Sequence, residues 1–528
     1  MYDIQAVVTM NNIMGGLVNE IAFGNLKNNF YNFFWKGNDT KVKINHHCAV
    51  GEEEIWNLMQ MLDGKGLLHG NYHLLHSNAY KEGENNDEAT GHWNTYSYFI
   101  ERKGEYPNKK SVAFGYLRFT VTLKKINKKW KIHKFICDEL MTFQPFDHIS
   151  WEFQSNTRNW DLEMAVPGEI DGENYILLRN LLGSFIQNGP GQAHTCFSKE
   201  SFEKFFLPCV CFKKIESAKV LREWFLSVEE KEKNENLYHF LMTATSPVLK
   251  LKDECHAKGI CLSQILTFEK DGQGNTFVKF HLGRMRLHFI REKDDGWKIT
   301  MLDLETLFCA SARKFIVSNT RPMAMRNNEK WPQAPVLTNR LNSDDVQAIF
   351  EAESYLPQWT ERLKRGDTET FIEHYMYNSR ENVSFSMASG ATHGYEKARE
   401  QQLESHRKFN TGTMVFRFPQ FHTGNAPAAA ISANKDYIDI SWMEWGWGNI
   451  GYGIVFDEKE TQRTYTPMIG QYYHKFVKDG EQWKLYAFGW KPLLQGLPAW
   501  NYDTEKVRGW SAQEYHYPWP LPFEAMKD

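Results

Sequence analysis

The richest collection of side chains that could do chemistry lies between residues 422 and 474. Carboxylates and imidazoles move protons, tyrosine hydroxyls donate hydrogen bonds, and tryptophan rings line apolar pockets. We therefore interpret five residues as candidate catalytic residues, namely His422, Asp439, Glu444, Tyr472 and His474. Three tryptophans between them are candidate substrate-binding residues, namely Trp442, Trp445 and Trp447.

Strand alternation divides the run 439–447 between two faces. Asp439 falls on the face of the two later tryptophans, and Glu444 falls on the face of the first. A carboxylate beside tryptophans is desolvated, which raises its pKa and suits it to act as a general base. Tyr472 and His474 share one face of their strand and are spaced to donate to one bound oxygen. In the alternative interpretation, the tryptophans pack against a helix and the polar tips reach water.

A second candidate segment is His73-Leu-Leu-His76, whose two histidines are further candidate catalytic residues. Together with His69 they fall at i, i+4 and i+7, which on a helix would form one face and could hold a metal ion. Gly70 and Asn71 interrupt such a helix, so we expect the start of a strand and no metal site.

A third group is defined by position relative to predicted hairpins. Arg118, Arg284 and Gln471 each lie five residues before the residue that closes a hairpin strand. Asp138 and Glu305 each follow a hairpin tryptophan by eight residues, and an inward carboxylate there could act as a base. Arg118 and Asp138 are the candidate substrate-binding residues of this group. The alternative is that these side chains face solvent.

The hairpins reveal that the chain repeats itself. Trp130-Lys-Ile, Trp297-Lys-Ile and Trp483-Lys-Leu each follow an alternating strand and a polar turn. The intervals of 167 and 186 residues are those of whole domains. Ser-Asn-Thr-Arg also recurs, at 155–158 and at 318–321. We infer three tandem copies of one domain.

Each copy has the same order of elements. An amphipathic helix opens it, such as Val346–Arg365, and a further helix follows Gly51 or Gly394. Long alternating strands close it; in the first copy they are predicted at Ala89–Ile100, Val112–Leu123 and Trp130–Thr142. Helices followed by a curved antiparallel sheet predict an α+β fold whose cone-shaped interior can hold a ligand.

The pattern resembles a known superfamily. Asp367-Thr-Glu-Thr-Phe371, Asn382-Val-Ser-Phe385 and Gly394-Tyr-Glu-Lys-Ala398 are similar to the opening of nuclear-transport-factor-2-like (NTF2-like) domains of the SnoaL-like branch. That branch continues with a His-containing strand start and a small polar pair, to which three segments are similar: His73-Leu-Leu-His76-Ser77-Asn78, His239 near Thr245-Ser246-Pro247, and His422-Thr-Gly-Asn425-Ala426-Pro427. The resemblance covers most of the chain, once in each copy, and implies three tandem cone-shaped domains.

What the resemblance implies for activity is cofactor-free proton transfer. Enzymes of this family remove a proton next to a carbonyl with a side-chain base and hold the enolate with hydrogen-bond donors; other members only bind ligands. His76 and His73 match the strand-start histidines of the bile-acid dehydratase group. The first-helix Tyr and Asp of that group have no match in Asn19–Lys27, and its final-strand Arg is replaced by Asp138-Glu139 and Lys491-Pro492. The sequence therefore does not predict that particular reaction.

Composition sets the class of protein. The chain has 528 residues, 42 % of them hydrophobic and 15 % aromatic, and a net charge of -3. The charge balance gives no electrostatic case for nucleic acid or an acidic membrane. Eight scattered cysteines form no metal or disulfide pattern, and no signal peptide or membrane span is evident. We expect a cytoplasmic protein without a cofactor. The glycines of Gly446-Trp-Gly448-Asn-Ile-Gly451 have the spacing of a dinucleotide-binding loop, but a strand-like run follows them where such a loop requires a helix, so we do not predict a dinucleotide site.

The predicted organisation is domain one at 1–150, a strap at 151–172, domain two at 173–315, a strap at 316–341, domain three at 342–498 and an aromatic, proline-rich strap at 499–528. Domain two is poor in paired acids and histidines and is the candidate degenerate copy. The predicted activity is a lyase or isomerase reaction (dehydration, isomerisation or cyclisation) on a small hydrophobic carbonyl or polyhydroxy compound such as a steroid, flavonoid or polyketide. The alternative is a non-catalytic protein that binds a hydrophobic ligand or serves assembly; self-association is left open.

Overall fold

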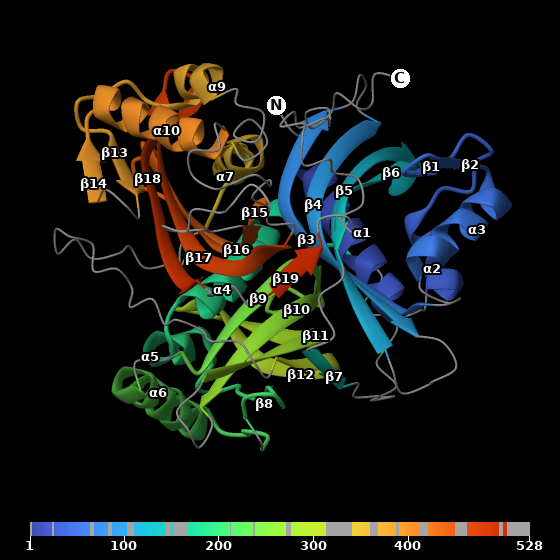
Figure 1. The fold of residues 1–528 in the computed structure, drawn as a ribbon, viewed down its shortest axis with the longest axis horizontal. Helices are drawn as coiled ribbons and strands as arrows, with labels where there is room; N and C mark the ends of the chain where they lie inside the picture. Colours follow the sequence, from blue (N-terminus) through green and yellow to red (C-terminus); the bar gives the residue numbers. More distant parts are fainter. Residues whose placement is uncertain are drawn as a thin grey trace.

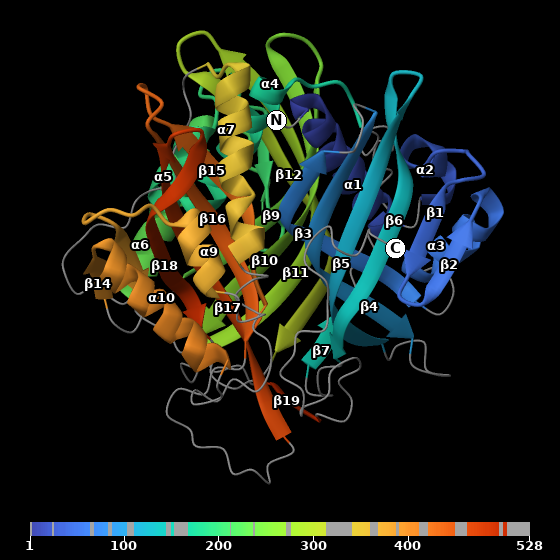
Figure 2. The same cartoon turned by 90° about the horizontal axis from the view of Figure 1, so that it is seen from above.

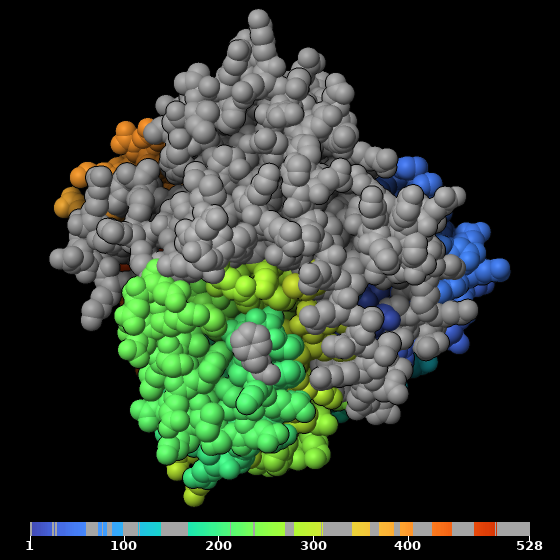
Figure 3. Space-filling view, turned by 60° about the horizontal axis from the view of Figure 1, so that its bottom comes forward, coloured from blue at the N-terminus to red at the C-terminus, as the bar shows by residue number. Residues whose placement is uncertain are grey.

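The computed structural model describes residues 3–23, 26–63, 68–82, 87–102, 110–143, 149–152, 167–211, 213–235, 238–270, 276–312, 340–359, 368–386, 390–410, 421–448, 462–495 and 500–503. These residues fold into three α+β units, each a curved antiparallel sheet with its own helices (Figures 1 and 2). The predicted threefold repeat and fold class are therefore confirmed. In the space-filling view unit two forms the coloured lower surface, with unit one in blue on the right and unit three in orange on the left (Figure 3).

Unit one comprises α1 (Ile4–Phe23), α2 (Leu26–Phe33), β1 (Lys41–Ile44), β2 (His47–Val50), α3 (Glu52–Asp63), β3 (Leu68–Glu82), β4 (Glu88–Arg102), β5 (Lys110–Ile126) and β6 (Lys129–Phe143). Its sheet has the order β2-β1-β6-β5-β4-β3. The three strands predicted from alternation are confirmed as β4, β5 and β6, and the helix after Gly51 is α3.

Unit two comprises α4 (Gly172–Gln187), α5 (Pro190–Ala193), the 3-10 turn η2 (His194–Cys196), β8 (Lys204–Phe206), α6 (Ala218–Glu235), β9 (Phe240–Leu251), β10 (His256–Lys270), β11 (Thr276–Glu292) and β12 (Gly296–Ala312). The order of the main strands is β12-β11-β10-β9. Strand β7 (Ile149–Glu152), which follows unit one in the chain, pairs with the far end of β12. The segment after unit one thus extends the sheet of unit two.

Unit three comprises α7 (Ser343–Glu353), α9 (Thr368–Tyr375), β13 (Val383–Ser386), β14 (Gly390–His393), α10 (Tyr395–Asn410), β15 (Phe421–Ile431), β16 (Tyr437–Gly448), β17 (Gln462–Asp479), β18 (Gln482–Gln495) and β19 (Trp500–Asp503). Its sheet order, β14-β13-β18-β17-β16-β15, is that of unit one. The rest of the C-terminal strap and both Ser-Asn-Thr-Arg segments lie outside the described residues.

Strand register shows that the units are equivalent residue by residue. The hairpin tryptophans Trp130, Trp297 and Trp483 occupy the same place in their strand pairs. In each edge strand a β-bulge falls at the same place, at Ser77-Asn78 in β3, Ser246-Pro247 in β9 and Ala426-Pro427 in β15. The segments that suggested a family resemblance therefore mark a kink of the chain.

The three units close on one another around a common axis. Helix α1 packs against both β3 and β9, and α4 packs against both β9 and β15. Helix α7 reaches β3, where the Phe350 ring lies 6.3 Å from that of Tyr80. The edge strands β3, β9 and β15 also contact one another. Helices α1 and α4 therefore each cover the edge strand of the next unit, and α7 reaches that of unit one. This explains why α1 is apolar over most of its surface and buried on nearly all sides.

Two asparagines make the same backbone contact at successive interfaces. Asn12 on α1 donates to the carbonyl oxygen of Leu249 at 3.0 Å and accepts from its amide at 2.9 Å. Asn180 on α4 does the same with Ala429, at 2.8 and 3.2 Å. Each side chain supplies both partners that an edge-strand residue of the next unit needs once it is buried.

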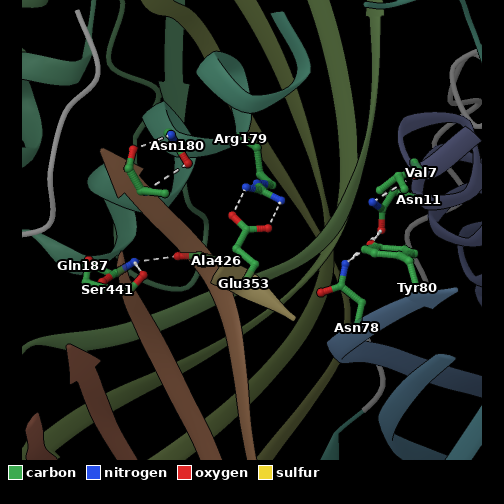
Figure 4. Close-up of polar contacts among 11 residues, drawn as sticks. Val7, Asn11, Asn78, Tyr80, Arg179, Asn180, Gln187, Glu353, Ala426 and Ser441 are labelled. Carbon is green, nitrogen blue, oxygen red and sulfur yellow. Dashed lines mark hydrogen bonds and ion pairs between the residues drawn. The ribbon is translucent and has the colours of Figure 1, made fainter. Parts of the chain in front are cut away.

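A buried ion pair joins the second and third helices. Arg179 of α4 and Glu353 of α7 form two parallel hydrogen bonds, one of 2.9 Å between Nη1 and Oε2, and both side chains are buried (Figure 4). Beside them, Tyr80 donates to Asn11 Oδ1 at 2.7 Å. The bidentate geometry satisfies both charges away from water.

We expect Asn12→Ala and Asn180→Ala each to lower the free energy of unfolding by about 3 kcal/mol, because each leaves a buried backbone N–H and C=O of the next unit unpaired. Urea unfolding measures the loss. Asn434→Ala, at an exposed turn position, is the control and should change stability by less than about 0.5 kcal/mol. Equal effects of the three variants would contradict the role of the two helix asparagines.

Candidate functional site

Each sheet has an inner face, covered by the helices of its own unit, and an outer face toward the other units. The inner face of unit three carries the densest set of polar and aromatic side chains. From β16, β17 and β18 it presents Trp442, Glu444, Tyr472, His474 and Trp490. The rings of Tyr355, Trp359 and Phe488 pack over this set.

Glu444 is fully buried, and donors from two neighbouring strands hold its carboxylate. The Tyr472 hydroxyl donates to Oε1 at 3.1 Å, and the Trp490 indole N–H donates to Oε2. Burial and, after it, the Glu444 carboxylate raise the pKa of Tyr472 well above its usual value, so that the hydroxyl remains a donor. Gly470 lies beneath this contact, where an added Cβ would come 2.4 Å from Trp490 Nε1.

His474 is a neutral imidazole with one defined tautomer. It is fully buried, and desolvation lowers its pKa to about 3. The Trp442 indole donates to its Nδ1 at 3.1 Å. An indole N–H can only donate, so Nδ1 carries no proton and the proton resides on Nε2. His474 therefore offers a neutral N–H donor on the same face as Glu444.

The other two units lack this constellation at the same register. The positions of Trp442, Glu444, Tyr472, His474 and Trp490 hold Trp93, Thr95, Phe119, Val121 and Cys137 in unit one. In unit two they hold Cys261, Ser263, Met285, Leu287 and Leu304. At these positions a carboxylate, a tyrosine hydroxyl and an imidazole occur together in unit three, whereas the only ionisable groups in units one and two are the buried thiols of Cys137 and Cys261.

A small cavity adjoins the cluster. It has a volume of about 10 Å³, and its lining includes Tyr355, Trp359 and Phe488, the same rings that cover Tyr472 and His474. That space is about enough for one water molecule. A larger ligand would have to displace part of this aromatic layer to reach Glu444.

Asp439 lies on the other side of the strand. Its Oδ1 accepts from the Tyr473 hydroxyl at 2.5 Å on the outer face, which it shares with the buried Trp445. The predicted division of 439–447 between two faces is confirmed. His422 and Trp447 are placed by register opposite Gly446 and Phe421, and their side chains are outside the described part.

The two histidines of unit one point to opposite faces of β3, which is a strand as expected rather than a metal-binding helix. His73 faces inward; its Nδ1 lies 2.8 Å from Ser97 Oγ and its ring meets Phe119 edge-on. His76 faces outward and contacts Tyr96 of β4 and Asn425 of unit three. Desolvation lowers the pKa of both to about 3.

The positional equivalence predicted for Arg118, Arg284 and Gln471 holds in the register, where they pair with Asp138, Glu305 and Lys491. All three lie on outer faces. Arg118 and Arg284 are buried, so the solvent-facing alternative is wrong for them. For Arg284 the reason is a helix from another unit, because its guanidinium stacks over Phe23 of α1 at 3.4 Å; Gln471 likewise donates to the Gln187 carbonyl of α4. Asp138 is partly buried, which raises its pKa, while Arg118 and Lys43 act in the opposite direction.

Sequence reasoning missed Trp490 and Gly470, which complete the Glu444 site. Both lie across the strand pairing from residues that had been singled out, Trp490 beside Tyr472 and Gly470 beside Glu444. A register drawn outward from the hairpin at Trp483 would have found them. Within the described ranges no group of three potential metal ligands occurs, and no helix is long and apolar enough to cross a membrane.

Solved structures similar to part of the chain are smaller proteins. A putative scytalone dehydratase from Novosphingobium aromaticivorans is 14 % identical and covers 27 % of this chain and 91 % of its own, with a TM-score of 0.23. A hexachlorocyclohexane dehydrochlorinase, LinA-type3, from Novosphingobium barchaimii is 11 % identical and covers 26 % and 89 %, also at 0.23. A putative dehydratase from the NTF2-like family from Streptomyces avermitilis is 10 % identical and covers 28 % and 96 %, at 0.23. No family model and no curated protein matches the sequence.

Gly470→Ala should lower the free energy of unfolding by about 1–3 kcal/mol, because the new methyl group must push Trp490 away from the Glu444 carboxylate and leave a buried charge short of one donor. Urea unfolding of the variant measures this. Gly189→Ala is the control, since nothing lies within 4 Å of its added Cβ. A Gly470→Ala protein as stable as the control would show that the contact is not tight.

Proposed function

We propose that unit three is a cofactor-independent lyase or isomerase whose general base is Glu444. The observation that carries the proposal is a buried carboxylate fixed by two donors on a face that also holds a neutral histidine donor. Trp490 and Tyr472 orient the carboxylate, so its position is set before a ligand arrives. The polar side chains gather on one inner face, as expected of a site rather than of a core.

In the proposed reaction, Glu444 removes a proton from a carbon next to a carbonyl. The electron pair of the broken C–H bond moves onto the carbonyl oxygen, and the Nε2–H of His474 donates to that oxygen as negative charge develops. Because the pKa of the imidazole is about 3, His474 is neutral at physiological pH and its N–H donates without a change in charge. In dehydration, the enolate electrons then form a C=C bond, the C–O bond of a β-hydroxyl breaks, and the proton held by Glu444 joins the hydroxyl to leave as water. In isomerisation, Glu444 returns the proton to another carbon.

The aromatic surroundings suit a small, mostly apolar substrate. Tyr355, Trp359 and Phe488 form an apolar layer over the donors, as a ring-containing carbonyl or polyhydroxy compound such as a steroid, flavonoid or polyketide would require. The proposal involves neither nucleic acid nor a membrane as partner.

A non-catalytic role is the second candidate, and one observation favours it. Glu444 and His474 are both fully buried and do not line the cavity, which is bounded by the rings that cover His474 and has room for about one water molecule. In that case the cluster would hold the unit together or line a site for a hydrophobic ligand without turnover.

A thermal-shift screen against steroids, bile acids, flavonoids and aromatic polyketides, with mass detection of products, tests the proposal. A ligand at about 100 times its Kd should stabilise the protein by roughly 2.7 kcal/mol. We expect conversion by the wild type and a loss of about 10²–10⁴-fold in Glu444→Gln, whose amide keeps the size of the carboxylate and removes the base.

Three further variants locate the base. Conversion lost in Asp439→Asn but kept in Glu444→Gln would move the base to the outer face, and loss in His73→Gln or His76→Gln would move it to unit one. Stabilisation by a ligand without any product would favour the non-catalytic role.

A further inference from the structure

One side chain from each unit meets at the axis where the edge strands converge. Asn425 of β15 donates from Nδ2 to His76 Nδ1 of β3 at 3.1 Å, and Thr243 of β9 donates from its hydroxyl to Asn425 Oδ1. All three residues are buried. We call this chain of hydrogen bonds, Thr243–Asn425–His76, the junction.

The direction of the hydrogen bonds in the junction determines the protonation state and the tautomer of His76. The Asn425 amide oxygen is occupied by the hydroxyl proton of Thr243, so its nitrogen faces the imidazole. Nδ1 of His76 must then be an acceptor, which requires a neutral ring with its proton on Nε2. A proton on Nδ1 would oppose the N–H of Asn425. Turning the amide over would restore that hydrogen bond but would leave a positive charge buried.

Of the residues that the structure describes, none that contacts His76 carries a charge that could balance a positive charge on the ring. From β4 it faces Asn94 and the Tyr96 ring at 5.1 Å, and from β15 it faces Asn425. The charged groups next in register are Arg118 on β5, which has the same sign, and beyond it Asp138 on β6. Among the described residues, desolvation alone accounts for its pKa shift, without a carboxylate partner.

We propose that the junction is an acid-sensitive lock between the three units: neutral His76 holds β3, β9 and β15 together, and its protonation loosens them. Burial lowers the pKa of His76 to about 3, from an ordinary value of 6.5. Between these two pKa values, His76 is therefore protonated in the opened state and neutral in the closed state. The lock is complete above pH 6.5 and weakens as the pH falls from 6.5 toward 3. It is independent of any catalytic role of Glu444.

Hydrogen–deuterium exchange of the full-length protein between pH 7 and pH 5, corrected for intrinsic rates, tests the lock. We expect protection of the peptides covering β3, β9 and β15 to fall by up to about tenfold per pH unit below 6.5, since one proton is linked to opening. Strand β12, on the side of its sheet away from the axis, reports opening within a unit and should lose less protection.

Two variants should remove the acid sensitivity for different reasons. Asn425→Asp replaces the amide with a carboxylate that would accept from both Thr243 and a protonated His76, so acid should no longer reduce protection of the edge strands. His76→Gln keeps an acceptor but cannot be protonated in this range, so the profiles of β9 and β15 should become flat, whereas β3 retains whatever acid sensitivity the buried His73 confers. His474→Gln removes a buried histidine with the same pKa from the interior of unit three and should leave the wild-type edge-strand profile unchanged.

Equal acid sensitivity of the wild type and His76→Gln would overturn the lock, as would equal loss of protection in β12 and the edge strands. A wild-type profile in Asn425→Asp would overturn it as well. Should Asn425→Asp fail to fold, the comparison of His76→Gln with His474→Gln decides the question.

Discussion

A buried edge of a β-sheet must find hydrogen-bond partners, and this constraint organises the whole molecule. In each sheet the innermost edge strand, β3, β9 or β15, is covered by the first helix of another unit. At two of these contacts an asparagine supplies both a donor and an acceptor to a strand residue. Because every unit depends on a helix from another, the ring is the stable object rather than the single domain.

The same arrangement separates two kinds of surface in each unit. Outer faces turn toward the other units, and there Arg284 and Gln471 are buried against helices of a neighbouring unit. Inner faces are covered mainly by the unit's own helices and differ more between the units. Units one and two fill the central inner positions with apolar or small side chains, whereas unit three holds an acid, a tyrosine and a histidine there. Chemistry and assembly thus use opposite sides of the same strands.

Local pattern predicted much of this. The hairpin tryptophans revealed the repeat, alternation predicted β4, β5 and β6, and the two faces of 439–447 followed from strand period alone. Burial of Arg284 could not be predicted, since it depends on a helix from another unit. The surroundings of His76 could not be predicted either. Its spacing of three residues from His73 places the two histidines on opposite faces of a strand, but the sequence does not show that the other units meet at His76. The sequence analysis missed Trp490 because its hydrogen-bond partner, Glu444, lies two strands away in the sheet.

Carrying the three copies on one polypeptide has a consequence for the axis itself. An assembly of three identical chains must repeat each axial side chain three times, so any contact there joins like with like. Here the three places are encoded separately and hold a hydroxyl, an amide and an imidazole, which line up as donor, relay and acceptor. Three copies on one chain thus permit a linear chain of three different polar groups, which exact threefold symmetry forbids, and each of these side chains can be substituted without altering the other two.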